Sequence, residues 1–387
     1  MKNIPYARQT VGKDDTQAVV DILRSDFLTQ GPAIERFEKA VAAYCGAKYA
    51  VAVNSATSAL HIACLAAGLG PGDLLWTSPN TFVASANCAL YCGADVDFVD
   101  IDERTYNMCA QKLMDKLLKA TRKGKIPKVI IPVHFAGQSC RMDEIGDLAR
   151  KHGITIIEDA SHAIGGRYKG YPIGSCTYSD MVVFSFHPVK IITTGEGGMV
   201  LTNREDLYRK LLLLRSHGIT RDPARMEYEP PGGWYYEQTT LGYNYRMTDI
   251  QAALGLSQLA KLDRFVARRT EIAARYNREL AGLPLVLHWQ DPDGQSAWHL
   301  YVVRVDAGQT GKSRREVFDA LRARGIGVNV HYIPVHTQPY YRRLGFRLGD
   351  FPAAESYYQE AVSLPMYYSL DAKEQKYVID ILRQVLA

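Results

Sequence analysis

The sequence lacks any long apolar run, and this absence limits where the protein can work. Among its 387 residues there is no uninterrupted stretch that approaches the ~18–20 apolar residues of a membrane-spanning helix. The opening residues, 1–15, contain no apolar core of the kind found in secretory signals. We therefore expect no membrane partner and a cytoplasmic location.

Patterns that bind metals or form disulfide frameworks are also missing. The seven cysteines are odd in number and dispersed, and none stands in a CxxC pair. Most of them lie in apolar segments, as buried free thiols do. The ten histidines show no HExxH spacing. The sequence thus predicts a reduced protein with no bound metal.

A strong charge of one sign is absent as well. The formal net charge is +5 at pH 7, which is mild for this length, and the basic residues are scattered. The pairs Arg322 with Arg324 and Arg342 with Arg343 are short clusters that fit a solvated helix face. Because there is no helix-turn-helix candidate either, we expect no nucleic-acid partner.

The composition is that of a folded globular protein. Hydrophobic residues make up 47% and charged residues 22%, close to the averages for such proteins. At roughly 150 residues per domain, the length allows about two to three domains. A sizeable buried core is therefore possible.

Helix-like and strand-like segments alternate from residue 34 onward, which predicts a mostly parallel sheet covered by helices. Helices are expected at residues 34–43, 57–69, 83–91 and 205–215. Strands are expected at residues 49–53, 74–77, 96–99, 128–133, 154–157, 181–184 and 199–202. A Gly-rich loop separates the last two strands, as in a hairpin.

The later part of the chain has a different pattern. Residues 222–238 are rich in Pro, Gly and Tyr and predict a long surface excursion. One long helix is expected at 248–276, followed by a strand at 299–305 and helices at 314–324 and 372–385. We predict an α/β fold with a large domain over residues 1–250 and a smaller C-terminal α+β domain over residues 251–387.

Residues 51–60, with the sequence VAVNSATSAL, join a strand to small residues that open a helix. Small side chains let a phosphate approach the backbone, and a helix N-terminus offers unpaired N–H groups and the positive end of a dipole. Ser55, Thr57 and Ser58 add hydroxyl groups. Plain helix capping also accounts for this segment when it is read alone.

Two carboxylates follow directly on an apolar strand in residues 156–162, IIEDASH. In an open parallel sheet, ligands bind at the carboxyl ends of the strands. A carboxylate at Glu158 or Asp159 can therefore pair with a protonated ring nitrogen. It can equally cap the following turn.

Lys190 lies in residues 183–198, VFSFHPVKIITTGEGG, between an apolar strand and a Gly-rich turn. A lysine near apolar groups and another positive centre loses proton affinity and becomes a nucleophile toward a carbonyl. A surface lysine on a loop is the competing interpretation. In this order, the phosphate cradle, the acidic strand end and the loop lysine describe a pyridoxal-phosphate site.

On these residues the sequence resembles the DegT/DnrJ/EryC1/StrS family of sugar aminotransferases, within the fold-type I pyridoxal-phosphate enzymes. The matching stretches follow the family order along nearly the whole chain, at residues 27–32, 37–38, 54–60, 81–82, 158–163, 185–198, 242–247, 251–253 and 363–367. The resemblance implies the fold-type I architecture, with a mostly parallel central sheet, and pyridoxal 5'-phosphate as cofactor. It also implies a transaminase activity.

Within the family, residues 187–190, 331–336 and 338–341 look most like members that act in pseudaminic-acid-type glycan synthesis. These members aminate the C4 keto group of a UDP-linked 4-keto-6-deoxy-N-acetyl hexosamine, and glutamate is the expected amino donor. Another nucleotide keto sugar is an alternative substrate. A pyridoxal-phosphate-binding regulator without transaminase activity is the alternative from a different class.

The resemblance implies a role for each matching residue. Lys190 would bond to the cofactor aldehyde and then move protons, and Asp159 would keep the pyridine nitrogen protonated. His162 would lie near the ring hydroxyl, where many relatives carry Gln. Phe82 would stack on one face of the ring, although a place in the core is the competing interpretation.

Phosphate binding is implied for Ala56, Thr57 and Ser185. Asn244 would reach the phosphate of the neighbouring subunit, which implies a homodimer with shared sites; an ordinary Asx turn is the alternative there. The candidates for contacting the substrate rest on the least specific motifs. They are Tyr6, Phe27, Leu28, Thr29, Gln30, Asn329, His331 and Tyr332, together with residues 222–238.

Overall fold

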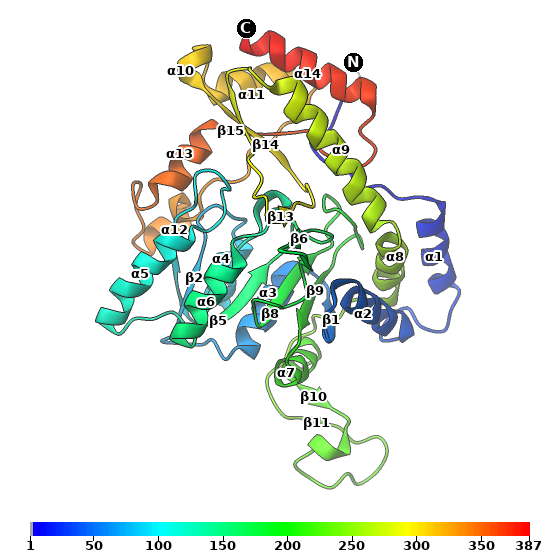
Figure 1. Ribbon diagram of the computed structural model, residues 1–387. Helices are drawn as coiled ribbons and strands as arrows, with labels where there is room; N and C mark the ends of the chain where they lie inside the picture. Colours follow the sequence, from blue (N-terminus) through cyan, green and yellow to red (C-terminus); the bar gives the residue numbers. More distant parts are fainter. Residues whose placement is uncertain (1–2) are drawn as a thin grey trace.

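Seven strands form the central sheet of the computed structural model, which describes residues 3–387 (Figure 1). In spatial order they are β1 (Tyr49–Val53), β9 (Gly198–Thr202), β8 (Met181–Ser185), β5 (Thr155–Asp159), β4 (Val129–Ile131), β2 (Leu74–Thr77) and β3 (Asp95–Phe98). Neighbouring strands are parallel except at β9, which is antiparallel to both β1 and β8. The predictions of a mostly parallel sheet and of a hairpin between the strands now labelled β8 and β9 are both confirmed.

Helices cover both faces of this sheet because its strands are apolar on both sides. Met181 and Val183 of β8 pack into the core on one face, whereas Val182 and Phe184 pack on the other. The first face carries α3 (Ala56–Ala66), α4 (Ala84–Tyr91) and α7 (Glu205–Arg215). The second carries α2 (Pro32–Cys45), α5 (Ala110–Lys123), α6 (Met142–His152) and α8 (Asp249–Leu259).

A second core lies in the C-terminal part of the chain. It is built on a three-stranded antiparallel sheet in the order β12 (Leu285–Leu287), β14 (Tyr301–Val305) and β15 (Ala361–Leu364). Side chains from α9 (Leu262–Leu280), α11 (Arg314–Ala323) and α14 (Ala372–Leu386) fill it. Smaller elements complete the fold: α1 (Lys13–Leu23), α10 (Ala307–Thr310), α12 (Pro339–Arg343), α13 (Pro352–Glu360), β6 (Arg167–Tyr168), β7 (Tyr171–Pro172) and β13 (Gly294–Gln295).

The N-terminal segment crosses over to this second core. Ile4 is buried there, and its backbone pairs with Ile326 after α11. The Tyr6 carbonyl accepts a hydrogen bond from the Met366 amide at 2.9 Å. This course brings the start of the chain to the region between the two cores.

The prediction of one continuous helix over residues 248–276 is wrong. The chain forms α8 and α9 instead, with a break at Ala260 and Lys261. Lys261 turns inward and pairs with the buried Asp15 carboxylate, with 2.8 Å between Nζ and Oδ1. The break lets α8 pack against α1 and α2 while α9 runs on into the second core. The predicted domain division after residue 250 stays a prediction.

The Pro-, Gly- and Tyr-rich segment projects from the body of the protein below α7 (Figure 1). Two short strands, β10 (Ile219–Thr220) and β11 (Glu237–Gln238), pair at its base. Tyr228 and Trp234 beyond them are largely exposed. Among residues 3–387, no helix is long and apolar enough to cross a membrane.

Candidate active site

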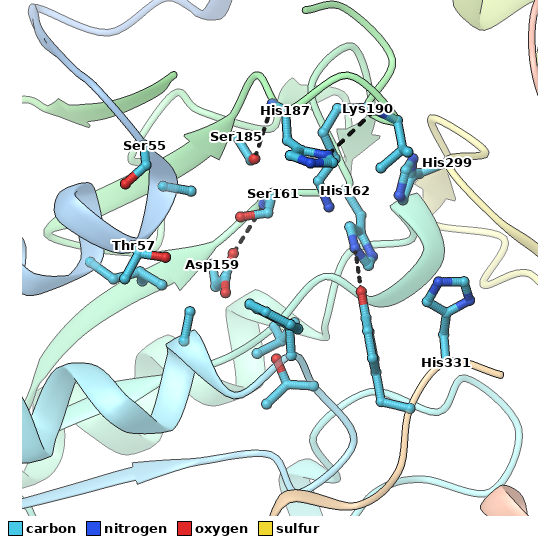
Figure 2. A pocket seen from close by; sticks show the side chains of 18 of the residues that line it. Ser55, Thr57, Asp159, Ser161, His162, Ser185, His187, Lys190, His299 and His331 are labelled. Carbon is cyan, nitrogen blue, oxygen red and sulfur yellow. Dashed lines mark hydrogen bonds between the residues drawn. The ribbon is translucent and has the colours of Figure 1, made fainter. Parts of the chain in front are cut away.

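A cavity of about 910 Å³ lies at the carboxyl ends of β5 and β8, beside the start of α3 (Figure 2). This is the edge at which open α/β sheets bind ligands. Most of the residues predicted from the sequence line it: Tyr6, Ala56, Thr57, Phe82, Asp159, His162, Ser185, Lys190, Asn329, His331 and Tyr332. The fold therefore brings together side chains from segments that are far apart in the sequence.

The other predicted residues do not line the cavity of their own chain. Asn244 is exposed, and its backbone pairs with Ser216 after α7. Residues 27–30 are exposed on the connection between α1 and α2, where Thr29 pairs with Thr248 ahead of α8. Their predicted roles in binding the partner's phosphate and the substrate stay predictions.

The first turn of α3 forms one wall of the cavity. Ser55 is the N-cap, and its Oγ accepts a hydrogen bond from the Ser58 amide at 3.1 Å. The first turn of a helix leaves N–H groups without intrahelical partners, here those of Ala56 and Thr57. Gly198 lies directly against this turn, since a Cβ at that position would come within 2.5 Å of the Ser55 backbone. Glycine thus allows α3 to begin at the sheet edge.

Asp159 ends β5 and faces the side of the sheet that carries α3 and α4. It lies two residues after Ile157, whose side chain packs on that face. One carboxylate oxygen, Oδ1, accepts a hydrogen bond from the Ser161 amide at 3.1 Å. The other, Oδ2, accepts one from the Ser85 hydroxyl at 2.6 Å. These two donors fix the carboxylate at the cavity wall.

Lys190 follows β8 in a tight turn, in which its amide donates to the His187 carbonyl at 2.9 Å. Burial lowers the pKa of its amine to about 8, and the Asp159 carboxylate acts in the opposite direction. Removing water disfavours the charged form of an amine. Near neutral pH, Lys190 is therefore a free base in a larger fraction of molecules than an ordinary lysine, and the free base is the form that attacks a carbonyl.

The Gly-rich turn after Lys190 is held by hydrogen bonds from two sides. The Thr193 hydroxyl donates to the Phe186 carbonyl at 2.9 Å, and the Gln251 side-chain amide donates to the Glu196 carbonyl at 2.9 Å. Gln251 comes from α8, which belongs to the opposite face of the sheet. The turn that presents Lys190 is thus anchored to both the sheet and a helix.

His162 forms two hydrogen bonds that define its tautomer. Its Nδ1 accepts from the Ala136 amide at 3.3 Å and therefore carries no proton in the neutral ring. Its Nε2 then carries the proton and donates to the Tyr332 hydroxyl at 3.1 Å (Figure 2). Burial, with Lys190 and His331 adding to it, holds the pKa of His162 well below its usual value. His162 is thus a neutral donor, and the Tyr332 proton is available to another acceptor.

His299 also lines the cavity, although the sequence pattern predicts it only as the first residue of a strand. Its ring centroid lies 4.3 Å from that of His162. The buried Arg269 donates from Nη1 to the carbonyls of Trp298 at 3.1 Å and His299 at 3.2 Å, and so fixes this turn. A histidine ahead of a strand carries no local signal that would assign it to a site formed by distant segments.

The side chains of this wall match the chemical groups of pyridoxal phosphate. The start of α3, with the nearby Ser185 hydroxyl, suits a phosphate. Asp159 suits a pyridine N–H, Lys190 suits the aldehyde, and the 58% exposed ring of Phe82 offers an apolar surface to a planar ring. When bound, the cofactor supplies an electron sink for the carbon that exchanges its amino group. In the described part of the chain, no group of three or more His, Cys, Asp or Glu side chains is placed to hold a metal ion.

The fold and this site define a fold-type I pyridoxal-phosphate enzyme. Residues 9–383 match the DegT/DnrJ/EryC1/StrS aminotransferase family, and the chain belongs to that family. It is therefore a pyridoxal-phosphate-dependent sugar aminotransferase. The predicted family, fold class, cofactor and enzyme class are confirmed.

Individual relatives cover nearly the whole chain. The spore coat polysaccharide biosynthesis protein SpsC of Bacillus subtilis (strain 168) is 44% identical over 386 residues, which are 99% of this chain and 97% of that protein. The UDP-4-amino-4,6-dideoxy-N-acetyl-beta-L-altrosamine transaminase of Campylobacter jejuni subsp. jejuni serotype O:23/36 (strain 81-176) is 39% identical over 387 residues, 99% of this chain and 97% of that protein. Among solved structures, Helicobacter pylori PseC, an aminotransferase involved in the biosynthesis of pseudoaminic acid, has a TM-score of 0.91 and 30% sequence identity, covering 100% of this chain and 99% of that one.

Proposed function

We propose that this enzyme transfers the amino group of glutamate to the C4 keto group of a UDP-linked 4-keto-6-deoxy-N-acetyl hexosamine. The product would enter pseudaminic-acid-type surface or flagellar glycans. The observation that carries this proposal is the 39% identity, along nearly the whole chain, with a transaminase named for a UDP-linked 4-amino-4,6-dideoxy sugar. The similarity to PseC supports the same substrate class. The expected cytoplasmic location stays a prediction.

Lys190 and Asp159 are the residues to which we assign the chemistry. Lys190, neutral in part because its pKa is lowered to about 8, would remove a proton from the amino-bearing carbon of the donor. It would later return a proton to C4 of the sugar, which sets the configuration of the new amine. Asp159 would hold the proton on the ring nitrogen of the cofactor, because a charge-assisted hydrogen bond is roughly twice as strong as a neutral one.

The remaining cofactor contacts follow from the geometry of the wall. Ala56, Thr57 and Ser185 would bind the phosphate at the start of α3, and Phe82 would cover one face of the ring. His162, whose Nε2–H is directed to Tyr332, would lie near the ring hydroxyl. These assignments rest on the cavity that the residues share.

A second subunit is needed to bind the charged parts of the substrates. Within the described chain, Lys190 is the single Lys or Arg side chain that lines the cavity. A UDP-sugar carries a diphosphate and glutamate carries two carboxylates, and such groups are bound by several cations or N–H donors. We therefore propose a homodimer in which Asn244 reaches the partner's phosphate site.

The sugar itself would be held by residues from both ends of the chain. Tyr6, Asn329, His331 and Tyr332 line the cavity and are the proposed contacts within one subunit. Residues 27–30 and most of the 222–238 excursion are exposed and would contribute across the dimer. The ring of Tyr6 lies 5.6 Å from that of His331, so these two aromatic groups form one surface.

The alternative substrate is another nucleotide keto sugar. One observation supports this alternative. The sequence identity with SpsC, which is named for spore coat polysaccharide biosynthesis, is 44%, whereas the identity with the altrosamine transaminase is 39%.

The test is an amination assay with a panel of UDP- and dTDP-linked 4-keto sugars, each with glutamate, aspartate or alanine. Mass spectrometry detects the amino sugar, and a coupled dehydrogenase detects the 2-oxoacid. We expect the highest kcat/KM with the UDP-linked N-acetyl hexosamine and glutamate. Faster turnover of a dTDP-sugar, or of a sugar without the N-acetyl group, would establish the alternative. Amination of none of them would refute the proposed substrate class.

A further inference from the structure

Two buried hydroxyl groups form a row of hydrogen bonds that ends at the Asp159 carboxylate. The Ser85 Oγ lies 2.6 Å from Asp159 Oδ2, and the Thr81 Oγ1 lies 2.8 Å from the Ser85 Oγ. Ser85 is fully buried and Thr81 is 2% exposed. No water competes with these contacts at Ser85, so its hydroxyl must find its partners within the protein.

The direction of this row follows from its end point. An ionised carboxylate has no proton to donate, so Ser85 donates to Asp159. A hydroxyl has one proton, so Ser85 can only accept from Thr81, which therefore donates. The row runs from Thr81 through Ser85 to the carboxylate, and hydrogen bonds in such a row polarise and strengthen one another.

The segment that leads into α4 also forms part of the cavity wall. Thr81 and Phe82 line the cavity, whereas Ser85 lies one turn further on and behind them. The Ser85 amide donates to the Phe82 carbonyl at 3.3 Å. One short segment therefore presents an aromatic ring to the cavity and a hydroxyl to the back of Asp159.

We propose that Ser85, supported by Thr81, is a positioning residue that directs the Asp159 carboxylate at the ring nitrogen of the cofactor. This inference rests on the proposed role of Asp159. The Ser161 amide holds Oδ1 and Ser85 holds Oδ2, so the carboxylate has no freedom to rotate away from the ring.

Other groups near Asp159 do not replace this contact. Lys190 and Tyr332 are two titratable side chains that lie near enough to respond to the Asp159 charge. Lys190 is committed to the cofactor aldehyde, and the Tyr332 oxygen already accepts from His162. Ser85 is thus the side-chain donor on the face of the carboxylate away from the cavity.

The test uses the holoenzyme loaded with pyridoxal phosphate carrying ¹⁵N in the ring, so that the nitrogen shift reports its protonation. In Ser85→Ala we expect the signal to move toward that of a neutral ring at pH 7.5. We also expect cofactor affinity to fall about ten-fold or more, since a hydrogen bond to a charged group is lost. Thr81→Val should move both quantities in the same direction by a smaller factor.

Thr77→Val is the matched control. Thr77 is fully buried on β2, and its hydroxyl donates to the Ile131 carbonyl at 2.8 Å rather than to Ser85 or Asp159. The Thr77→Val variant should lose about as much thermal stability as the Thr81→Val variant does. Its ¹⁵N signal should stay the same as that of the wild type. A nitrogen signal and a cofactor affinity in Ser85→Ala equal to those of the control would overturn the proposal.

Thr81→Val and Asp159→Asn distinguish the possible outcomes. If Ser85→Ala does not fold, the proposal is tested with Thr81→Val, and a wild-type nitrogen signal in Thr81→Val refutes it. In Asp159→Asn the protonated signal should disappear. If it persists there, the proposed role of Asp159 fails, and the inference about Ser85 fails with it. If Asp159→Asn loses the signal and Ser85→Ala keeps it, only the inference about Ser85 fails.

Discussion

The lowered pKa of Lys190 determines how quickly the cofactor-free protein captures pyridoxal phosphate at each pH. Only the neutral amine attacks the aldehyde. With a pKa of about 8, roughly a quarter of Lys190 is neutral at about pH 7.5, against about a thousandth of a lysine at its ordinary pKa. Capture should therefore be on the order of 200-fold faster than at an exposed lysine of equal intrinsic reactivity.

Stopped-flow absorbance of the cofactor-free enzyme with pyridoxal phosphate measures this rate. The second-order rate constant should rise between pH 6 and about 8 and then level off. Because the Asp159 carboxylate raises the pKa of Lys190, Asp159→Ala should move the midpoint to lower pH. If the rate constant instead continues to rise through pH 10, Lys190 behaves as an ordinary surface lysine and burial does not lower its pKa.

Three further predictions follow from the same residues. Asp159→Asn keeps the shape of the side chain but should lose most of the transamination rate and bind the cofactor more weakly; near-normal turnover would show that Asp159 only caps a turn. Lys190→Ala and Asn244→Ala chains, each nearly inactive, should regain activity when mixed under conditions of subunit exchange, because one site of each heterodimer then carries neither change. No recovery after exchange is verified by mass would exclude shared sites. Lys190→Met should stabilise the cofactor-free protein by at most about 3 kcal/mol at pH 7, since the folded state lowers the pKa of Lys190 to about 8 and so disfavours its charged form. This increase in the free energy of unfolding is present below pH 8 and disappears as the pH rises toward 10.5. Denaturant unfolding of both proteins at pH 7 and at pH 10.5 measures it.

The sequence predicts the sheet well because local patterns determine its strands. The apolar runs that become β5 and β8 are buried on both faces, and few other structures accommodate such runs. Their carboxyl ends carry Asp159 and Ser185, so the position of the site edge follows from the strand assignment. The parity of the strand also places Ser185 on the face of Val183, which packs beside α3.

Features that depend on distant contacts are not readable from local patterns. At the break between α8 and α9, Lys261 pairs with Asp15, which is about 250 residues away along the chain and gives no local signal at residue 261. His299 reaches the cavity because Arg269 fixes its turn from another helix. Ser85 lies in a stretch of small residues that resembles any buried helix start, and only the folded structure shows its contact with Asp159.

The proposed function depends above all on the cavity beside α3, which would bind pyridoxal phosphate through Lys190 and carry out transamination. Reduction of the holoenzyme with borohydride, followed by digestion and peptide mass mapping, tests it most directly. We predict a single pyridoxyl label on Lys190, and its loss when glutamate is added before the reduction. A label on any other lysine, or a label that glutamate does not remove, would contradict the account.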